Sequence, residues 1–171
     1  QVSLSLSQKF KTTMNTPNTK INHLLCEGQV ETATSFLQEL MERDEFLTIQ
    51  TFETLIEAWC QRDKLNVAMT IAKTATEVGF RASKRMYTRL IQGFVKRFEI
   101  DVAVQLLESM MSDANIVPDT ETFDRVLKFV SNRDPNKAMS LVLALRRLKK
   151  RQPDISTFLI MIRMFCDVVK N

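Results

Sequence analysis

A repeat with a period of about 35 residues runs through most of this 171-residue chain. Four aromatic residues mark it, with spacings of 35, 36 and 35 residues: Phe52, Tyr87, Phe123 and Phe158. Alanines recur at a constant spacing of 35 residues: Ala33, Ala68, Ala103 and Ala138. A period of this length indicates a stacked repeat architecture, in which each unit contacts mainly its neighbours.

The apolar residues inside each unit follow helical spacing. In the second unit they recur at i, i+3, i+4 and i+7, the pattern of an amphipathic helix: Phe52, Leu55, Ile56 and Trp59. No segment alternates with period two for long enough to form a strand, and turn residues are few, with three Gly and four Pro. We therefore predict an all-α fold, a right-handed α-solenoid of about nine helices stacked as antiparallel hairpins.

The chain is expected to have two parts. A flexible N-terminal segment is predicted over 1–17 and the solenoid over 18–171. The solenoid is expected to divide into four repeats and a terminal helix, near 18–48, 49–83, 84–119, 120–154 and 155–169. The terminal helix either ends the array or begins a further repeat.

Charge is unevenly distributed along the chain. Residues 1–80 contain 7 Lys or Arg and 10 Asp or Glu, a net charge of −3, whereas residues 81–171 contain 17 and 10, a net charge of +7. This asymmetry favours an anionic partner for the C-terminal half, nucleic acid first, with a solvated basic surface as the alternative. No apolar run approaches the ~18 residues that a membrane span needs, so no membrane partner is expected.

Little in the sequence supports catalysis. His23 is the only histidine, and the three cysteines, Cys26, Cys60 and Cys166, lack the spacing of metal ligands. There is no glycine-rich phosphate loop and no nucleophile motif. We therefore predict a protein that is not an enzyme and that has no cofactor and no metal site.

The units resemble pentatricopeptide repeats. The resemblance rests on segments 52–60 and 87–95, FETLIEAWC and YTRLIQGFV, which are similar to the first helix of that repeat. It rests also on the Pro-Asp dipeptides at 118–119 and 153–154, which close two of the units. The closing Pro-Asp and the 35-residue period favour this family over the 34-residue tetratricopeptide repeat. The resemblance covers nearly the whole chain, 18–171.

The resemblance implies binding of single-stranded RNA, with one base read by each repeat. Two side chains of a repeat read the base: the residue after the aromatic, here called the reading residue, and the last residue, here called the closing residue. The four pairs in chain order are Asn18 with Thr48, Glu53 with Ser83, Thr88 with Asp119, and Asp124 with Asp154. The third pair matches the family's guanine-favouring type, and the other three depart from its pattern.

The base-stacking position also departs from the family, which usually has an aliphatic residue two before the aromatic. Polar residues stand there in this chain: Gln50, Arg85, Glu121 and Ser156. Arg85 is the one stacking candidate, because its planar guanidinium can lie on a base.

Phosphate contacts are expected to supply much of the affinity, because three or four bases stacked at roughly 1–3 kcal/mol each bind weakly against the cost of association. Basic residues at the turns and in the run at 146–151 are the candidates: Arg62, Lys96, Arg97, Arg133, Arg146, Arg147, Lys149, Lys150 and Arg151.

Two functions follow from the resemblance. The first is an organellar RNA-binding protein that holds single-stranded RNA in a concave groove and supports RNA processing or intron splicing, as a homodimer or with other RNA-processing proteins. The second is a structural subunit of a mitochondrial ribosome or another large ribonucleoprotein, binding rRNA and proteins by shape and charge. A protein-binding scaffold is a third interpretation, which the acidic first half fits. The expected location is an organelle, the mitochondrion favoured over the chloroplast.

Overall fold

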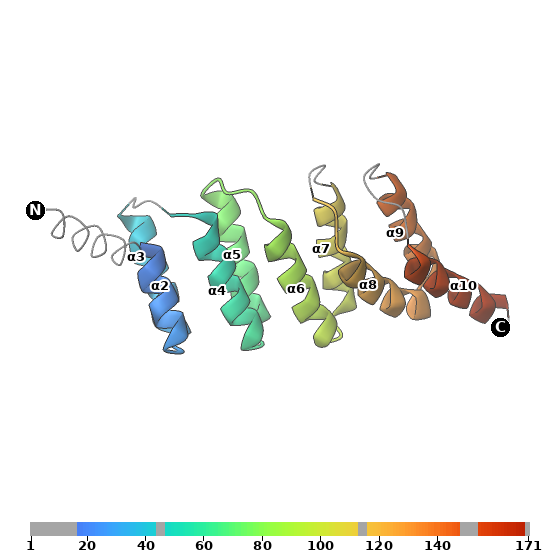
Figure 1. The fold of residues 1–171 in the computed structure, drawn as a ribbon, viewed down its shortest axis with the longest axis horizontal. Coiled ribbons are helices and arrows are strands. Elements are labelled where there is room, and N and C mark those ends of the chain that lie inside the picture. The colour runs from blue at the N-terminus through green and yellow to red at the C-terminus, as the bar shows by residue number, and fades with distance from the viewer. Residues whose placement is uncertain (1–16, 44–46, 113–115, 148–153, 170–171) are drawn as a thin grey trace, which may run out of the picture. The chain divides into compact units, whose positions relative to one another are not determined.

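The computed structural model describes residues 17–43, 47–112, 116–147 and 154–169, and almost all of them are helical. The helices are α2 (Pro17–Cys26), α3 (Val30–Glu42), α4 (Ile49–Gln61), α5 (Leu65–Glu77), α6 (Lys84–Lys96), α7 (Ile100–Ser112), α8 (Thr120–Arg133), α9 (Pro135–Arg147) and α10 (Ile155–Val169) (Figure 1). No strand occurs in these ranges. The all-α prediction is therefore confirmed.

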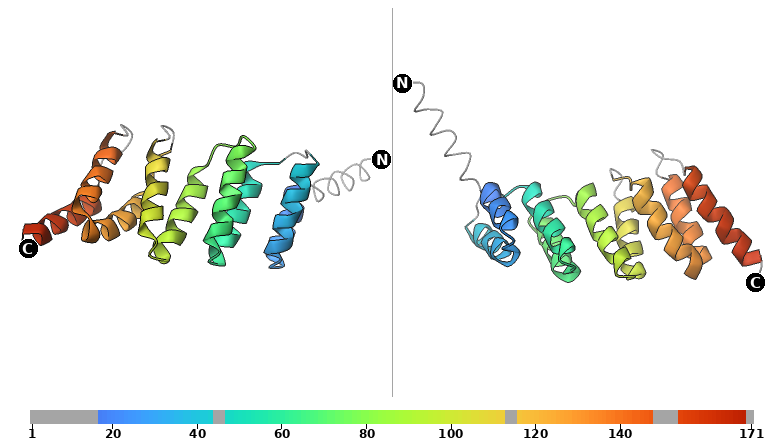
Figure 2. Two further views of the ribbon diagram at one scale, coloured as in Figure 1. Left: turned by 180° about the vertical axis from the view of Figure 1, so that it is seen from behind. Right: turned by 60° about the horizontal axis from the view of Figure 1, so that its bottom comes forward.

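The chain forms two compact units, residues 1–81 and 82–171. In the first unit α2 packs against α3 and α4 against α5, and α2 and α3 also contact α4. In the second unit α6 packs against α7 and α8 against α9, with further contacts of α8 to α6 and α7 and of α9 to α7 (Figure 2). The last helix, α10, packs on α8. Within each unit the first helix of one repeat thus contacts the first helix of the next.

The repeated apolar positions form the core. Phe52 and Phe123 are 0% and 1% exposed, and burial of a side chain of this size stabilises the fold by about 1.5–3 kcal/mol. The four alanines at 35-residue spacing are also buried, and their small side chains allow paired helices to approach closely: Ala33, Ala68, Ala103 and Ala138. None of the helices in the described ranges has the length and the apolar character needed to cross a membrane.

Three of the hairpin turns use a residue in the left-handed conformation. Gly28, Asp63 and Phe98 have φ of 76°, 59° and 59° and are spaced by 35 residues. After each of them, the next N–H donates to the carbonyl five residues earlier, which completes a Schellman motif at the end of the first helix. The fourth hairpin differs, because Asp134 has φ of −143° and its Oδ1 caps α9 by accepting from the N–H of Lys137 at 3.0 Å.

The last helix leaves an apolar face exposed. Phe158 occupies the position of Phe52 and Phe123 in the repeat, but it is 51% exposed. Ile162 and Phe165, one and two turns further along α10, are 57% and 47% exposed. In α4 and α6 the equivalent faces are covered by α5 and α7, and no described residue supplies the corresponding helix after α10.

Candidate functional site

The reading and closing residues of the first repeat contact each other directly. Asn18 lies on α2, and its Nδ2 donates a hydrogen bond of 2.9 Å to Oγ1 of Thr48. Thr51 on α4 donates its hydroxyl proton to Oδ1 of Asn18, and the hydroxyl oxygens of Thr48 and Thr51 are 3.2 Å apart. In this first-repeat cluster (Asn18, Thr48 and Thr51) the amide of Asn18 has both a donor and an acceptor engaged within the protein.

Two hydroxyl groups join the reading and closing residues of the fourth repeat. Oγ1 of Thr157 lies 2.6 Å from Oδ1 of Asp124 and 3.2 Å from Oδ1 of Asp154. Oγ of Ser156 is 2.7 Å from Oδ1 of Asp154 and also within hydrogen-bond distance of Oδ2 of Asp124. Because each hydroxyl carries one proton, the two hydroxyls can donate one hydrogen bond to each carboxylate. These four residues form the fourth-repeat cluster.

The fourth-repeat cluster favours the ionised form of Asp154. The hydrogen bonds from the hydroxyl of Ser156 and from the backbone N–H of Thr157 lower the pKa of Asp154 from 3.8 to about 2. Asp154 therefore stays negatively charged at neutral pH although a second carboxylate, that of Asp124, shares its hydroxyl partners. Two carboxylates at this place can accept hydrogen bonds from a ligand but repel phosphate groups.

The third repeat holds its reading residue differently. Lys84 and Thr88 are four residues apart on α6, so they lie on one face of the helix. Nζ of Lys84 is 2.5 Å from Oδ1 of Asp119, and both of these side chains are about half exposed. Oγ1 of Thr88 is buried and has no hydrogen-bond partner in the described part of the chain. The reading hydroxyl of this repeat is therefore not fixed by a neighbour.

The reading and closing residues of the second repeat fall in different units. Glu53 lies half-buried on α4 in the first unit, and Ser83 precedes α6 in the second. The hydroxyl of Ser83 accepts a hydrogen bond of 3.2 Å from the backbone N–H of Met86. Ser83 therefore has a structural role at the start of α6.

The closing residues, predicted as base readers, also share a structural position. Each is the residue directly before the first helix of the next repeat: Thr48, Ser83, Asp119 and Asp154. Ser, Thr and Asp are favoured there because their oxygens accept bonds from free N–H groups at the helix start. Ser83 and Asp154 each accept from the N–H three residues later, at 3.2 and 3.1 Å, whereas Thr48 and Asp119 make no such bond. Thr48 instead accepts from Asn18, and Asp119 pairs with Lys84.

Threonines directly before the aromatic residue were not among the predicted site residues. Thr51, Thr122 and Thr157 stand at this position in α4, α8 and α10, and all three are buried. Thr51 and Thr157 hold the reading residues Asn18 and Asp124. The available signal was a threonine directly before three of the four aromatics, with Met86 before Tyr87 as the exception.

The stacking positions are exposed in the structure. Arg85 lies on the exposed surface of the first turn of α6. Gln50 is also exposed, and Glu121 forms an ion pair of 2.6 Å with Arg125 one turn further along α8. Ser156 is a member of the fourth-repeat cluster. None of these four residues is the aliphatic residue that the family usually has at this position.

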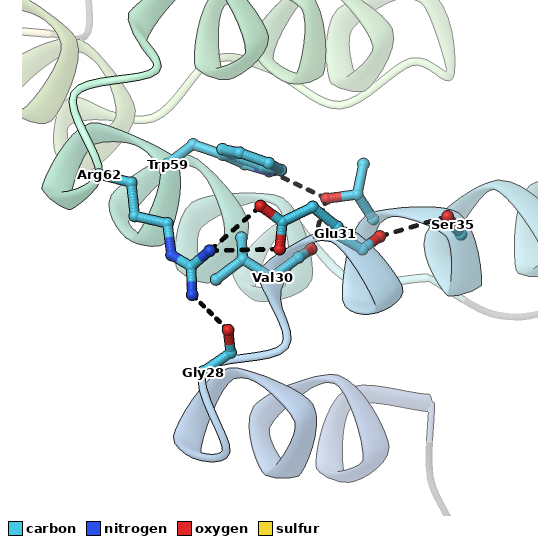
Figure 3. Close-up of polar contacts among 7 residues, drawn as sticks. Gly28, Val30, Glu31, Ser35, Trp59 and Arg62 are labelled. Carbon is cyan, nitrogen blue, oxygen red and sulfur yellow. Dashed lines mark hydrogen bonds and ion pairs between the residues drawn. The ribbon is translucent and has the colours of Figure 1, made fainter.

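Two of the predicted phosphate contacts are engaged within the protein. Arg62 pairs with the carboxylate of Glu31, with its NH1 atom 3.1 and 3.2 Å from the two oxygens, and it also donates to the carbonyl of Gly28 (Figure 3). Nε of Arg97 is 2.9 Å from Oε1 of Glu99. Arg62 thereby links the hairpin of the first repeat to the end of α4, next to the hydrogen bond from Trp59 to Thr34.

The other described phosphate candidates are exposed. Lys96, Arg146 and Arg147 form no ion pair with described residues. Arg133 lines a hollow of about 440 Å³ between α7, α8 and α9, together with the carboxylates of Asp101, Glu108 and Asp134. Those carboxylates disfavour an anion at Arg133. Lys149, Lys150 and Arg151 lie outside the described residues.

The described site residues are mainly hydrogen-bonding groups. In the ranges that the structure describes, no three His, Cys, Asp or Glu side chains gather as a metal site. The polar groups instead recur at the junctions between successive first helices, α2 with α4, α6 with α8, and α8 with α10. Within each unit, such polar junctions suit recognition of an extended polar ligand.

Comparison with known proteins decides the family. A family model described as "Pentatricopeptide repeat-containing protein" matches residues 66–170. The chain belongs to the pentatricopeptide repeat family. It is 26% identical over 114 residues to the pentatricopeptide repeat-containing protein At5g25630 of Arabidopsis thaliana, covering 64% of this chain and 20% of that protein. It is 24% identical over 119 residues to At3g09650 of the same species, described as chloroplastic, covering 65% of this chain and 15% of that protein.

A solved structure of a family member has the same fold. The crystal structure of the pentatricopeptide repeat protein PPR10 from maize matches 98% of this chain with a TM-score of 0.67 at 14% identity. The match covers 26% of the maize chain. This likeness confirms the predicted helical-repeat solenoid. The chain thus spans about a quarter or less of the length of the pentatricopeptide repeat proteins that it matches.

Proposed function

We propose that this pentatricopeptide repeat protein binds single-stranded RNA with its reading and closing residues. The observation that carries the proposal is the pairing of these residues: Asn18 contacts Thr48, and Asp124 and Asp154 share the same two hydroxyl partners. Side chains that meet in this way can contact one base together. The recurrence of such a pair at the junction of successive first helices matches a ligand with a regular repeat of its own.

The third repeat is the main base-reading element in this proposal. Asp119 is about half exposed, makes no cap bond, and has one oxygen paired with Lys84, so its carboxylate retains acceptor capacity. Thr88 can donate and accept. In the first-repeat and fourth-repeat clusters, protein partners already occupy much of the hydrogen-bonding capacity. We therefore expect one nucleotide to be read with clear preference and its neighbours with little.

Binding strength is proposed to come mainly from exposed cations. Arg146 and Arg147 at the end of α9 are exposed and form no ion pair with described residues. Each phosphate contact on a single strand makes log K fall with log salt by about 0.7. Arg146→Gln with Arg147→Gln should therefore weaken binding to all sequences and reduce the salt slope, without a change in base preference.

The test is a titration of the protein with a random pool of single-stranded RNA at several salt concentrations, followed by sequencing of the bound fraction. We expect binding that weakens steeply with salt and a preference at one nucleotide that Thr88→Ala abolishes. Ser109→Ala, a neutral change at an exposed position on α7, is the matched surface control. Absence of binding to the pool at low salt would show that the proposed function is wrong.

We further propose that the bound RNA is an organellar transcript whose processing or intron splicing the protein supports. The family membership and the chloroplastic description of one relative support an organelle. Crosslinking in mitochondrial and chloroplast extracts, followed by sequencing of the attached RNA, tests both the organelle and the transcript class. Enrichment of intron or precursor RNA is the expected result.

A second function is that of a structural subunit of a large ribonucleoprotein. It is favoured by the first-repeat and fourth-repeat clusters, whose reading residues are already paired within the protein. Where protein hydroxyls already occupy the reading residues, as at Asp124, contacts by shape and charge gain relative weight. In that case the crosslinked RNA should be rRNA, and the Arg146 and Arg147 substitutions should abolish binding while Thr88→Ala leaves sequence preference unchanged.

A further inference from the structure

Three threonines stand apart from all other described polar side chains. Thr51, Thr122 and Thr157 are 2%, 1% and 2% exposed and are the buried polar residues among those that the structure describes. Each lies directly before the aromatic residue of a first helix, in α4, α8 and α10. A polar group that recurs in the interior at the same repeat position needs a physical reason, because burial of an unpaired hydroxyl is unfavourable.

Two of these threonines hold the reading residue of the preceding repeat. The hydroxyl of Thr51 donates to Oδ1 of Asn18, 33 residues earlier. The hydroxyl of Thr157 donates to Oδ1 of Asp124 at 2.6 Å, also 33 residues earlier. In both cases the threonine fixes the orientation of a side chain that is proposed to face the ligand.

The third threonine, Thr122, has no such partner in the structure. Its counterpart in the repeat is Thr88, 34 residues earlier, and α6 and α8, which carry the two residues, pack against each other. Oγ1 of Thr88 and Oγ1 of Thr122 are the two buried side-chain polar atoms without a partner in the described part of the chain. A threonine hydroxyl ends one bond closer to the backbone than the oxygen of Asn or Asp, so Thr88 falls short of the reach of Asn18 and Asp124.

We propose that Thr122 is a positioning residue for base recognition by Thr88, an inference that rests on the proposed RNA binding. When a nucleobase binds at the third repeat, the side chain of Thr88 turns about its Cα–Cβ bond and its hydroxyl leaves its buried position. The hydroxyl of Thr122 then donates to Oγ1 of Thr88, as Thr51 and Thr157 donate to their partners. Oγ1 of Thr88 then serves as the acceptor for Thr122, and the proton of Thr88 is directed at the base. Thr88 is thereby fixed as a donor, and the repeat selects a base edge that presents an acceptor at this place.

This assignment explains why both hydroxyls lack partners in the free protein. Buried polar groups are nearly always paired, and an exception in a recognition site is expected to be satisfied on ligand binding. The bound state gains two hydrogen bonds, one between the threonines and one to the base. The third repeat therefore gains more from its ligand than the two repeats whose reading residues are already paired.

The experiment compares the wild-type protein with Thr122→Val and Thr122→Ser in binding to the random single-stranded RNA pool. Valine keeps the shape of threonine but lacks the hydroxyl, and serine keeps the hydroxyl. For Thr122→Val we expect about fivefold weaker binding to the preferred RNA, loss of preference at one nucleotide, and unchanged binding to non-preferred RNA. Thr122→Ser should retain the preference.

Stability and specificity separate the outcomes. Thr122→Val is expected to raise the midpoint of thermal unfolding, because it removes an unpaired buried hydroxyl, so weaker binding cannot be ascribed to unfolding. A Thr122→Val protein with wild-type base preference would overturn the positioning role while the proposed RNA binding stands, and so would a wild-type protein that binds RNA with no preference. Failure of the wild-type protein itself to bind RNA would overturn both proposals.

Discussion

Two junctions in the second unit place the same repeat positions in opposite states. Where α8 meets α10, Thr157 donates to Asp124, and Ser156 joins Asp124 to Asp154. Where α6 meets α8, Thr122 and Thr88 occupy the equivalent positions, and neither hydroxyl has a partner among the described residues. The junctions differ in the reading residue, because the hydroxyl of Thr88 ends one bond closer to the backbone than the carboxylate oxygens of Asp124. They differ also in the spacing of the two positions, which is 34 residues for Thr88 and Thr122 and 33 for Asp124 and Thr157.

The contrast shows that a repeat scaffold can be regular while its recognition surface is not. In a closed junction, such as that of α8 with α10, the reading residue is already paired within the protein. The junction gains stability from these hydrogen bonds and has less capacity to bind a ligand. In an open junction, such as that of α6 with α8, buried hydroxyls have no partner among the described residues. These hydroxyls destabilise the free protein and can be satisfied by a ligand. Stability and binding are therefore expected to vary in opposite directions between these two places.

The largest expected effect is that of Asp124→Ala at the closed junction. The substitution removes the nearer of the two acceptors of the buried hydroxyl of Thr157, and hydrogen bonds to a charged group contribute about 1.5–3 kcal/mol. We expect the free energy of unfolding, measured by urea denaturation, to fall by about 2 kcal/mol. Thr88→Val at the open junction is the matched control and should cause no loss, since its hydroxyl has no partner. Equal losses for the two variants would contradict the contrast.

A second pair of substitutions should change stability with opposite signs. Thr157→Val removes a hydrogen bond and leaves a carboxylate less satisfied, so we expect the free energy of unfolding to fall by about 1–2 kcal/mol. Thr122→Val removes an unpaired hydroxyl of the same burial and should raise it by about 1 kcal/mol. Both are read from urea denaturation of the full chain, and a loss in both would show that Thr122 has a partner in solution.

The closed junction should also give the protein an acid dependence that the open junction lacks. The pKa of Asp154 is lowered from 3.8 to about 2, so its ionised form stabilises the folded state fully above about pH 4. That contribution is lost as the pH falls from about 4 to 2. We expect Asp154→Asn to remove this part of the acid dependence in denaturation curves between pH 5 and 2. A constant difference between wild type and variant over this range would contradict the assignment.

The smallest expected effect on stability is that of Lys84→Ala beside the open junction. The ion pair of Lys84 with Asp119 is about half exposed, and such pairs contribute about 0–1 kcal/mol. Lys137→Ala is a matched control, because Nζ of Lys137 is 2.7 Å from Oε1 of Glu108 with similar exposure on another face. Both substitutions should change unfolding little, and only Lys84→Ala should change base preference in the RNA selection.

The sequence was sufficient for the fold because the fold depends on positions that repeat. The 35-residue spacing of Ala33, Ala68, Ala103 and Ala138 predicted buried helix contacts, and all four are buried. Gly79, shortly after the end of α5, has a φ of 98°, a conformation that favours glycine. These features depend on local backbone preferences and on a periodic apolar face, which a single sequence displays.

The site was less predictable because it depends on contacts between helices. Thr157 donates to Asp124, and Arg62 pairs with Glu31. Both contacts join side chains more than 30 residues apart in the chain. The role of the closing residues as N-caps was available from their chemistry, since Ser, Thr and Asp before a helix are typical caps. The exposure of Phe158 could not be predicted from the sequence, because its aromatic position follows the same pattern as the buried Phe52 and Phe123.

The exposed face of α10 has a thermodynamic consequence. A partner or an adjoining segment that covers Phe158, Ile162 and Phe165 can bind only when α10 is folded, so its binding is linked to the folding of the second unit. A binder present at 100 times its dissociation constant raises stability by about 2.7 kcal/mol through this linkage. The apparent melting temperature of this chain should therefore depend on whether such a binder is present and at what concentration. The stability of the covered helices α4 and α6 is set by the chain itself.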